Sequence, residues 1–330
     1  MKISEKFNLP VKGHKDIDFV NIDTVRDTRL FLDPYVMQAL PDGFCQKAFK
    51  SVNSFFTEVF ATCAINDNKK LYELLAHASE PNETNLGMKT ISQHGKGSTP
   101  DELTELFYKF YKDIIHTHNM NDLGLNICIY IKGFDHDKMS DLITNIIRNL
   151  LFEFTVSQCL KWNMPLDKDV TLIGHYWDVY SLTWAELKGN AFLIDGKSFL
   201  LVPKIIVRRE YTANVERYIK QYILKELQQK HLDSNSELCT KVTLKSGRIK
   251  LRPPKIDELY RLEVTGIKHK TYAVDYSELN RNKELSFIKD ILNRIREGYG
   301  SISDEELDRI VNKIITRHDI AGKFEIKSID

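Results

Sequence analysis

The chain has 330 residues, of which 42% are hydrophobic and 28% charged, and its formal net charge is +1. This size and balance exclude a disordered chain and predict a large domain with a sizeable core and a smaller domain. A nearly neutral chain has no global attraction for nucleic acid or acidic membranes, so such a partner requires a local cationic patch.

Cysteine usage and hydropathy indicate a compartment. The five cysteines are widely spaced and form no CxxC pair, which predicts reduced, buried thiols. The opening MKISEKFNLP lacks the apolar core of a signal peptide, and apolar runs such as residues 199–203 are too short to span a bilayer. We therefore expect a cytoplasmic protein without membrane insertion.

The first half of the chain begins with a predicted strand and two helices. Residues 18–33 are rich in β-branched and aromatic side chains, and TRLFLDP predicts a strand stopped by Pro34. Apolar residues at three-and-four spacing over 44–63 predict a buried helix. Thr99, followed by Pro100 and two acids, predicts the start of a second helix.

Residues 126–145, NICIYIKGFDHDKMSDLITN, are the most informative segment. The run ICIYI predicts a buried strand, and an apolar stripe over about 139–162 predicts the longest helix. Asp135, Asp137 and Asp141 therefore crowd the point where a strand ends and a helix begins, which is where α/β proteins often hold metals and phosphates.

Beyond residue 170 apolar residues recur at every second position, which predicts β-strands, with a hairpin turn at Asp195-Gly196. Residues 214–231 predict a helix, and LDSNSE at 232–237 predicts a linker. A second hairpin, VTLKSGRIKLRPP, and helices near 285–297 and 304–317 follow. We expect an α/β or α+β fold: a core domain of residues 1–231, with a mixed sheet flanked by long amphipathic helices, and a smaller basic α+β module of residues 238–330.

The acidic loop is a candidate metal site, because carboxylates hold Mg²⁺ or Mn²⁺, which polarise a phosphoryl group and activate water. Asp33 follows another predicted strand, so the candidate ligands are Asp33, Asp135, Asp137 and Asp141. Alternatively, Asp137 or Ser140 caps the long helix.

Asp141, Lys204 and Arg208 are the candidate catalytic residues. The two cations follow the apolar run FLLVP, where they would neutralise charge that develops on phosphate; structural ion pairs are the alternative. Asn145 and Arg148 continue from Asp141 at helical spacing, either as an active-site wall or as a solvated face.

Two short motifs suggest other sites. Glu186-Leu187-Lys188, with Asp178 upstream, has the ExK arrangement of PD-(D/E)xK nucleases, but its polar surroundings favour a surface strand. Residues 94–101 match HxKx4D, the phospholipase D motif, without its second copy. A simpler interpretation is that this segment binds an anion at the N-terminus of the helix that follows it, or that it is only a loop capping that helix. The sequence holds no HExxH, GxSxG or dinucleotide glycine fingerprint.

Residues 241–271 hold nine Lys or Arg and three acids. Lys245, Arg248, Lys250 and Arg252 recur along the predicted hairpin and are the candidate nucleic-acid-binding residues. The alternative is a patch that balances acidic surface elsewhere.

TRLFLDP, GFDHDKMSDLITN and FLLVPK resemble blocks found in a set of uncharacterised bacterial proteins, over roughly the first 210 residues. The resemblance implies a bacterial or phage-related cytosolic protein and a component of a defence locus, and it assigns no catalytic residue.

Two functions follow as hypotheses. The first is a metal-dependent nuclease or related phosphodiesterase that uses Mg²⁺ or Mn²⁺, in anti-phage defence. The second is a non-catalytic subunit or sensor that binds nucleic acid, or a partner protein from the same locus, through the basic module. The nuclease requires acids from separate segments to converge within reach of one metal ion, whereas the binding module does not.

Overall fold

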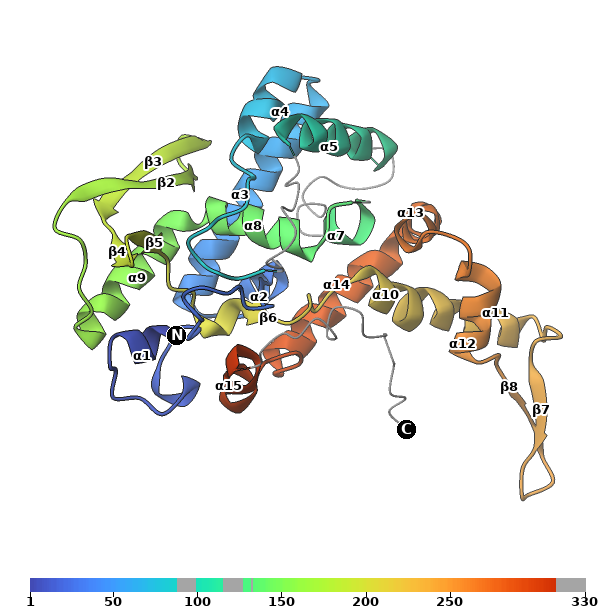
Figure 1. Cartoon of the computed structure of the whole chain (residues 1–330). Helices are drawn as coiled ribbons and strands as arrows, with labels where there is room; N and C mark the ends of the chain where they lie inside the picture. The colour runs from blue at the N-terminus through green and yellow to red at the C-terminus, as the bar shows by residue number, and fades with distance from the viewer. Residues whose placement is uncertain (88–98, 115–126, 132, 313–330) are drawn as a thin grey trace.

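The computed structural model describes residues 1–87, 99–114, 127–131 and 133–312 (Figure 1). The fold combines many helices with short antiparallel strand pairs, which confirms the α+β class. In this described part the strands form four separate two-stranded antiparallel sheets in place of the mixed sheet expected from the sequence. Helices therefore supply most of the core.

The N-terminal region contains α1 (Ile3–Lys6), the short 3-10 helix η1 (His14–Asp16), β1 (Phe31–Leu32) and α2 (Pro34–Ala39). The strand predicted from TRLFLDP is only two residues long and pairs with β6 (Val207–Arg208). Pro34 ends this strand by starting a helix, because proline suits the first helical position.

The helix predicted over residues 44–63 is confirmed as α3 (Gly43–Ala64), which is the centre of the core. Its aromatic side chains pack against two other segments. The ring centroids of Phe55 and Trp177 lie 5.2 Å apart, and the ring of Phe56 stacks on that of Phe107. The helices α4 (Asn68–Leu75) and α5 (Pro100–Ile114) cover one end of α3. Thr99 caps α5 as expected, and the structure adds a reciprocal hydrogen bond from Thr99 N to the Glu102 carboxylate.

The prediction of a strand at residues 127–131 is wrong. Residues Ile127–Tyr130 form a helical turn, α7, whose four side chains are all buried. Burial on every side removes the periodicity that separates a strand from a buried helix, so an apolar run this short fits both. The expected long helix is divided at Ile147 into α8 (His136–Ile146) and α9 (Arg148–Trp162).

Two hairpins follow α9. The strands β2 (Val170–Asp178) and β3 (Thr183–Asn190) form the longest pair, with a bulge between Leu172 and Gly174. The strands β4 (Phe192–Ile194) and β5 (Lys197–Phe199) form the predicted tight hairpin. Asp195 and Gly196 both have positive φ, at 52° and 76°, as a primed two-residue turn requires.

The remaining elements begin with η2 (Lys204–Ile206) and a continuous helical stretch of α10 (Val215–Tyr218), the π-helical segment η3 (Ile219–Ile223) and α11 (Leu224–Asp233). The second predicted hairpin is confirmed as β7 (Thr240–Thr243) and β8 (Ile249–Arg252). The last described elements are α12 (Ile256–Leu259), the π-helical η4 (Tyr260–Val264), α13 (His269–Leu279), α14 (Arg281–Arg296) and α15 (Asp304–Asn312).

Elements after residue 238 pack on elements before residue 231. Tyr218 Oη lies 2.8 Å from Ser277 Oγ, and Arg296 Nε donates to the carbonyl of Ala39 at 3.1 Å. One cluster of buried apolar side chains extends from α1 to α15. The domain boundary at residues 232–237 stays a prediction. In the described ranges, no helix combines the length and apolarity that crossing a bilayer requires.

Candidate functional site

One lysine ties the acidic loop before α8 to α13. Lys270 Nζ donates to the carbonyls of Ile131 and Phe134 at 2.8 and 3.0 Å and lies 3.3 Å from Asp135 Oδ1. Asp135 is the N-cap residue of α8 without a side-chain cap hydrogen bond, and its side chain is 75% exposed. The loop is thus anchored mainly through its backbone, and Asp135 faces solvent.

Neither Asp137 nor Ser140 is the N-cap of α8, so the expected capping role is wrong for both. Asp137 lies in the first turn, where a negative charge complements the helix dipole. Ser140 Oγ accepts from Leu32 N at 3.0 Å and joins α8 to β1. Asp141 follows one residue later and is half-buried.

Asp33 is fully buried and holds two segments together. Its Oδ1 accepts from Tyr35 N at 2.9 Å as the N-cap of α2, and its Oδ2 accepts from Thr212 N and Oγ1, each at 2.8 Å. Burial raises the pKa of Asp33, against the opposing effects of Thr212 and of the Arg208 charge. Both carboxylate oxygens already accept protein hydrogen bonds, which favours a structural role.

Arg208 lies near Asp33, and Tyr211 lies near both Asp33 and Asp141. The Arg208 side chain is buried, its Nη1 donates to the carbonyls of Ile205 and Val207, and its Nε has no partner among the described residues. The Tyr211 hydroxyl is also buried and has no hydrogen-bond partner in the part of the chain that the structure describes. Burial raises the pKa of Tyr211, and the thiol of Cys128 and the carboxylates of Asp33 and Asp141 raise it further. The charges of two acids from separate segments, Asp33 and Asp141, thus both act on one hydroxyl.

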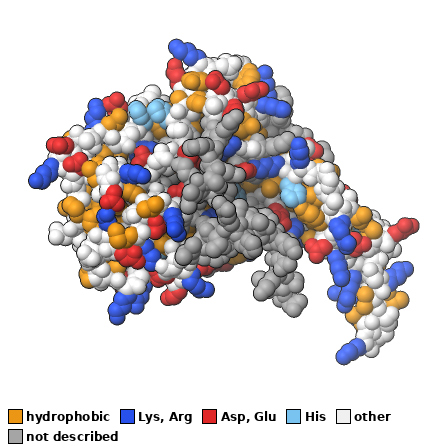
Figure 2. All heavy atoms as spheres, viewed as in Figure 1, with side chains coloured by type: hydrophobic (Ala, Val, Ile, Leu, Met, Phe, Trp, Pro, Cys, Tyr) orange, Lys and Arg blue, Asp and Glu red, His pale blue; other side chains and the backbone are white. Residues whose placement is uncertain are grey.

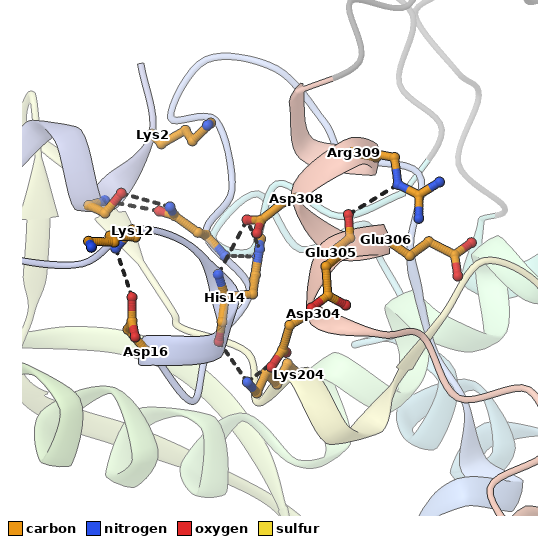
Figure 3. Close-up of polar contacts among 12 residues, drawn as sticks. Lys2, Lys12, His14, Asp16, Lys204, Asp304, Glu305, Glu306, Asp308 and Arg309 are labelled. Atoms are coloured by element: carbon orange, nitrogen blue, oxygen red, sulfur yellow. Dashed lines mark hydrogen bonds and ion pairs between the residues drawn. The ribbon is translucent and has the colours of Figure 1, made fainter.

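Lys204 faces a different part of the molecule. Its Nζ donates to the His14 carbonyl and to Asp304 Oδ1, both at 2.7 Å (Figure 3). His14 Nδ1 lies 2.6 Å from Asp308 Oδ1, while its Nε2 accepts from Asn21 N at 3.0 Å. Lys204 thus joins η1 to α15. These contacts involve neither Arg208 nor the acidic loop.

Two of the four predicted metal ligands, Asp33 and Asp135, bind different protein partners. In the ranges that the structure describes, no group of three His, Cys, Asp or Glu side chains lies close enough together to hold a metal ion. Asp33 binds backbone and hydroxyl groups, and Asp135 binds Lys270. The metal site, and the catalytic set of Asp141, Lys204 and Arg208, stay predictions.

The ExK triplet lies on the surface, as its polar surroundings indicate. Glu186 and Lys188 belong to β3 and pair with each other at 2.8 Å, with side chains 54% and 61% exposed. Asp178 caps the turn between β2 and β3 by accepting from Tyr180 N and Ser181 Oγ. The HxKx4D match begins at residues outside the described ranges, and its last three residues belong to the start of α5.

Asn145 and Arg148 are both buried, so the solvated face expected as one alternative is wrong, and the active-site wall stays a prediction. Arg148 Nε donates to the His175 carbonyl at 3.1 Å, and Nη1 lies 2.8 Å from Glu83 Oε1. Arg148 Nη2 also donates to Asn145 Oδ1. This network attaches β2 to the helical core.

The hairpin of β7 and β8 carries the candidate nucleic-acid-binding residues and projects from the body (Figure 1). Leu244 N donates to the Arg248 carbonyl at 2.8 Å and Gly247, with φ 77°, closes a three-residue loop. Since cross-strand partners share a face, one face is formed by Thr240, Val242, Leu244, Arg248, Lys250 and Arg252.

These four cations are exposed to solvent. Lys245, Arg248, Lys250 and Arg252 form no ion pair with any residue that the structure describes. Elsewhere in this half of the chain Lys220, Lys230 and Lys270 each lie within 3.3 Å of an acid. Figure 2 shows Lys and Arg side chains along the projecting hairpin.

Sequence reasoning missed two side-chain pairs. His136 stacks on Tyr211 with ring centroids 4.4 Å apart, and burial and the Lys270 charge lower the pKa of His136 to about 4. His14 and Asp308 are 294 residues apart. No local spacing links such distant residues, so only the fold reveals these pairs.

Residues 8–214 match the family described as Domain of unknown function (DUF8370), and the chain belongs to this family. The match covers the core of α3, the acidic loop, Lys204 and Arg208, and it ends before the basic hairpin. No curated protein and no solved structure matches the chain.

Proposed function

We propose that the protein binds nucleic acid through the hairpin of β7 and β8, with Lys245, Arg248, Lys250 and Arg252 contacting phosphates. The observation that carries the proposal is that all four cations are exposed and form no ion pair with a residue that the structure describes. Unpaired cations attract phosphates and release the counterions condensed on nucleic acid, which supplies most of the affinity of non-specific binding.

The test replaces all four residues by Gln and measures binding of a labelled duplex by fluorescence anisotropy between 50 and 200 mM salt. Each lost phosphate contact lowers the slope of log K against log salt by about 0.9, so the slope falls by about 3 to 4. A matched control replaces four exposed lysines outside the hairpin, which form no ion pair with a described residue: Lys15, Lys47, Lys168 and Lys197.

Both variants lose the same formal charge, so a purely global effect weakens binding equally in each. The proposal expects the control to keep nearly wild-type affinity and slope. It fails if the wild-type protein does not bind at 50 mM salt, or if the control loses as much affinity as the hairpin variant.

A metal-dependent nuclease is the second candidate, and it is supported by two acids from separate segments, Asp33 and Asp141, whose charges both raise the pKa of the buried Tyr211. If the acids hold a divalent ion, Mg²⁺ or Mn²⁺ raises the melting temperature, and the double change Asp135→Ala with Asp141→Ala abolishes that rise. Asp141→Asn then removes nuclease activity, whereas Lys188→Ala on the exposed β3 retains it. A wild-type melting curve unchanged by millimolar Mg²⁺ and Mn²⁺ contradicts this candidate.

We also propose a cytoplasmic location, which the cysteines support: all five are free, and four are buried. A bacterial origin, a role in anti-phage defence and a partner protein from the same locus stay predictions from the sequence blocks. Co-purification of the tagged full chain from its native cells tests the partner.

A further inference from the structure

The hairpin of β7 and β8 has the dimensions of a ribbon that enters a nucleic-acid groove. Paired strands lie about 4.8 Å apart, so a two-stranded ribbon with its side chains is roughly 10 Å wide. The major groove of B-form DNA is about 12 Å wide and admits such a ribbon. The deep major groove of A-form RNA is too narrow for it.

The composition of the ribbon argues against single strands. Residues 240–252, TKVTLKSGRIKLR, contain no aromatic side chain. Proteins that hold single-stranded nucleic acid depend on aromatic side chains on which bases stack, each worth about 1–3 kcal/mol. The ribbon also holds no acid, so its whole length suits a channel lined by phosphates.

The two faces of the ribbon differ. Arg248, Lys250 and Arg252 line one face along β8, opposite Leu244 and Val242 on β7. Residues two apart on a strand repeat about every 6.6 Å, so the three cations extend over about 13 Å, the reach of several phosphates of one DNA strand. The apolar side chains beside them suit contact with thymine methyl groups on the groove floor.

We infer that the ligand of the hairpin is double-stranded DNA, with the face that carries Arg248, Lys250 and Arg252 lying in the major groove. This inference rests on the proposed function. The opposite face, formed by Lys241, Thr243, Ile249 and Leu251, then points away from the DNA.

The first test compares the full chain on three labelled probes of one sequence at one salt concentration: duplex DNA, single-stranded DNA and duplex RNA. We expect duplex DNA to bind at least tenfold more tightly than either of the others. Equal or tighter binding of single-stranded DNA or of duplex RNA overturns the inference and leaves the proposed function standing. Failure to bind any probe removes both.

The second test distinguishes the faces of the ribbon with two substitutions of equal charge. Leu244 and Ile249 are both exposed, at 40% and 70%, so an acid is tolerated at either position. Leu244→Glu places the acid on the cationic face and should weaken duplex binding about tenfold, whereas Ile249→Glu on the other face should weaken it less than threefold. Equal losses, or the reverse order, contradict the assigned face.

Discussion

Replacing Asp33 tests whether this acid is structural or functional. Asp33→Ala removes the N-cap of α2, which costs about 1 kcal/mol of unfolding free energy. It also leaves the buried Thr212 N–H without its acceptor, at about 1–3 kcal/mol, and removes the negative charge of Asp33 that favours the buried guanidinium of Arg208. The lost attraction to Arg208 and the relief from burying a carboxylate have opposite signs, so we expect a total loss of about 2–4 kcal/mol of unfolding free energy.

Urea unfolding of the full chain at pH 7 measures the loss, with Asp42→Ala as the control. Asp42 caps α3 through Phe44 N and Cys45 N but is only half-buried, so its loss should be about 1 kcal/mol. If Asp33→Ala costs no more than the control, or stabilises the protein, the structural interpretation is refuted. A stabilising result is typical of a functional acid that is maintained at the expense of stability.

Three further predictions concern stability and reactivity. Gly189→Ala places a Cβ 2.4 Å from the ring of Phe152 and should cost about 1–3 kcal/mol in urea unfolding, whereas Gly43→Ala, with open space around it, should cost nothing; equal effects contradict this packing. Burial raises the pKa of the four buried thiols to about 12. A thiol reagent at pH 8 should therefore modify only Cys239 until urea is added, and rapid modification of a second thiol in the native protein contradicts this prediction. Burial lowers the pKa of His14, so the unfolded chain binds a proton at a higher pH than the folded chain, and the free energy of unfolding falls below about pH 6.5. Urea unfolding between pH 7 and 5 should show a smaller decrease in this free energy for His14→Gln than for the wild type. The same decrease in both proteins contradicts the prediction.

The sequence predicted elements that have one buried face and clear ends. The periodic stripe of α3 and the Asp195-Gly196 turn belong to this class, because both depend on interactions within a few residues. The prediction of a strand over residues 127–131 is wrong because a segment buried on all sides has no periodic signal that separates a strand from a helix. The candidate site depended on contacts between distant segments, which local patterns do not contain.

Asp33 shows how one pattern fits two roles. An Asp after a strand suggests a metal ligand, whereas an Asp before a Pro is also a helix N-cap signal. The contact with Thr212, which favours a structural role for Asp33 in addition to the cap, is 179 residues away in the sequence. For the hairpin of β7 and β8, the local sequence predicts both the turn and the spacing of the cations. Only the structure shows that these cations form no ion pair with a described residue.

The contact between His14 and Asp308 also bears on synthesis. At about 5–20 residues per second, the ribosome makes the 294 residues that separate them in roughly 15–60 s. During that interval Asp308 and Asp304 do not yet exist for His14 and Lys204 to bind. A nascent chain therefore completes its N-terminal region only after nearly all of its described helices have emerged, and a chain that stops before α15 leaves that region open to chaperones and proteases.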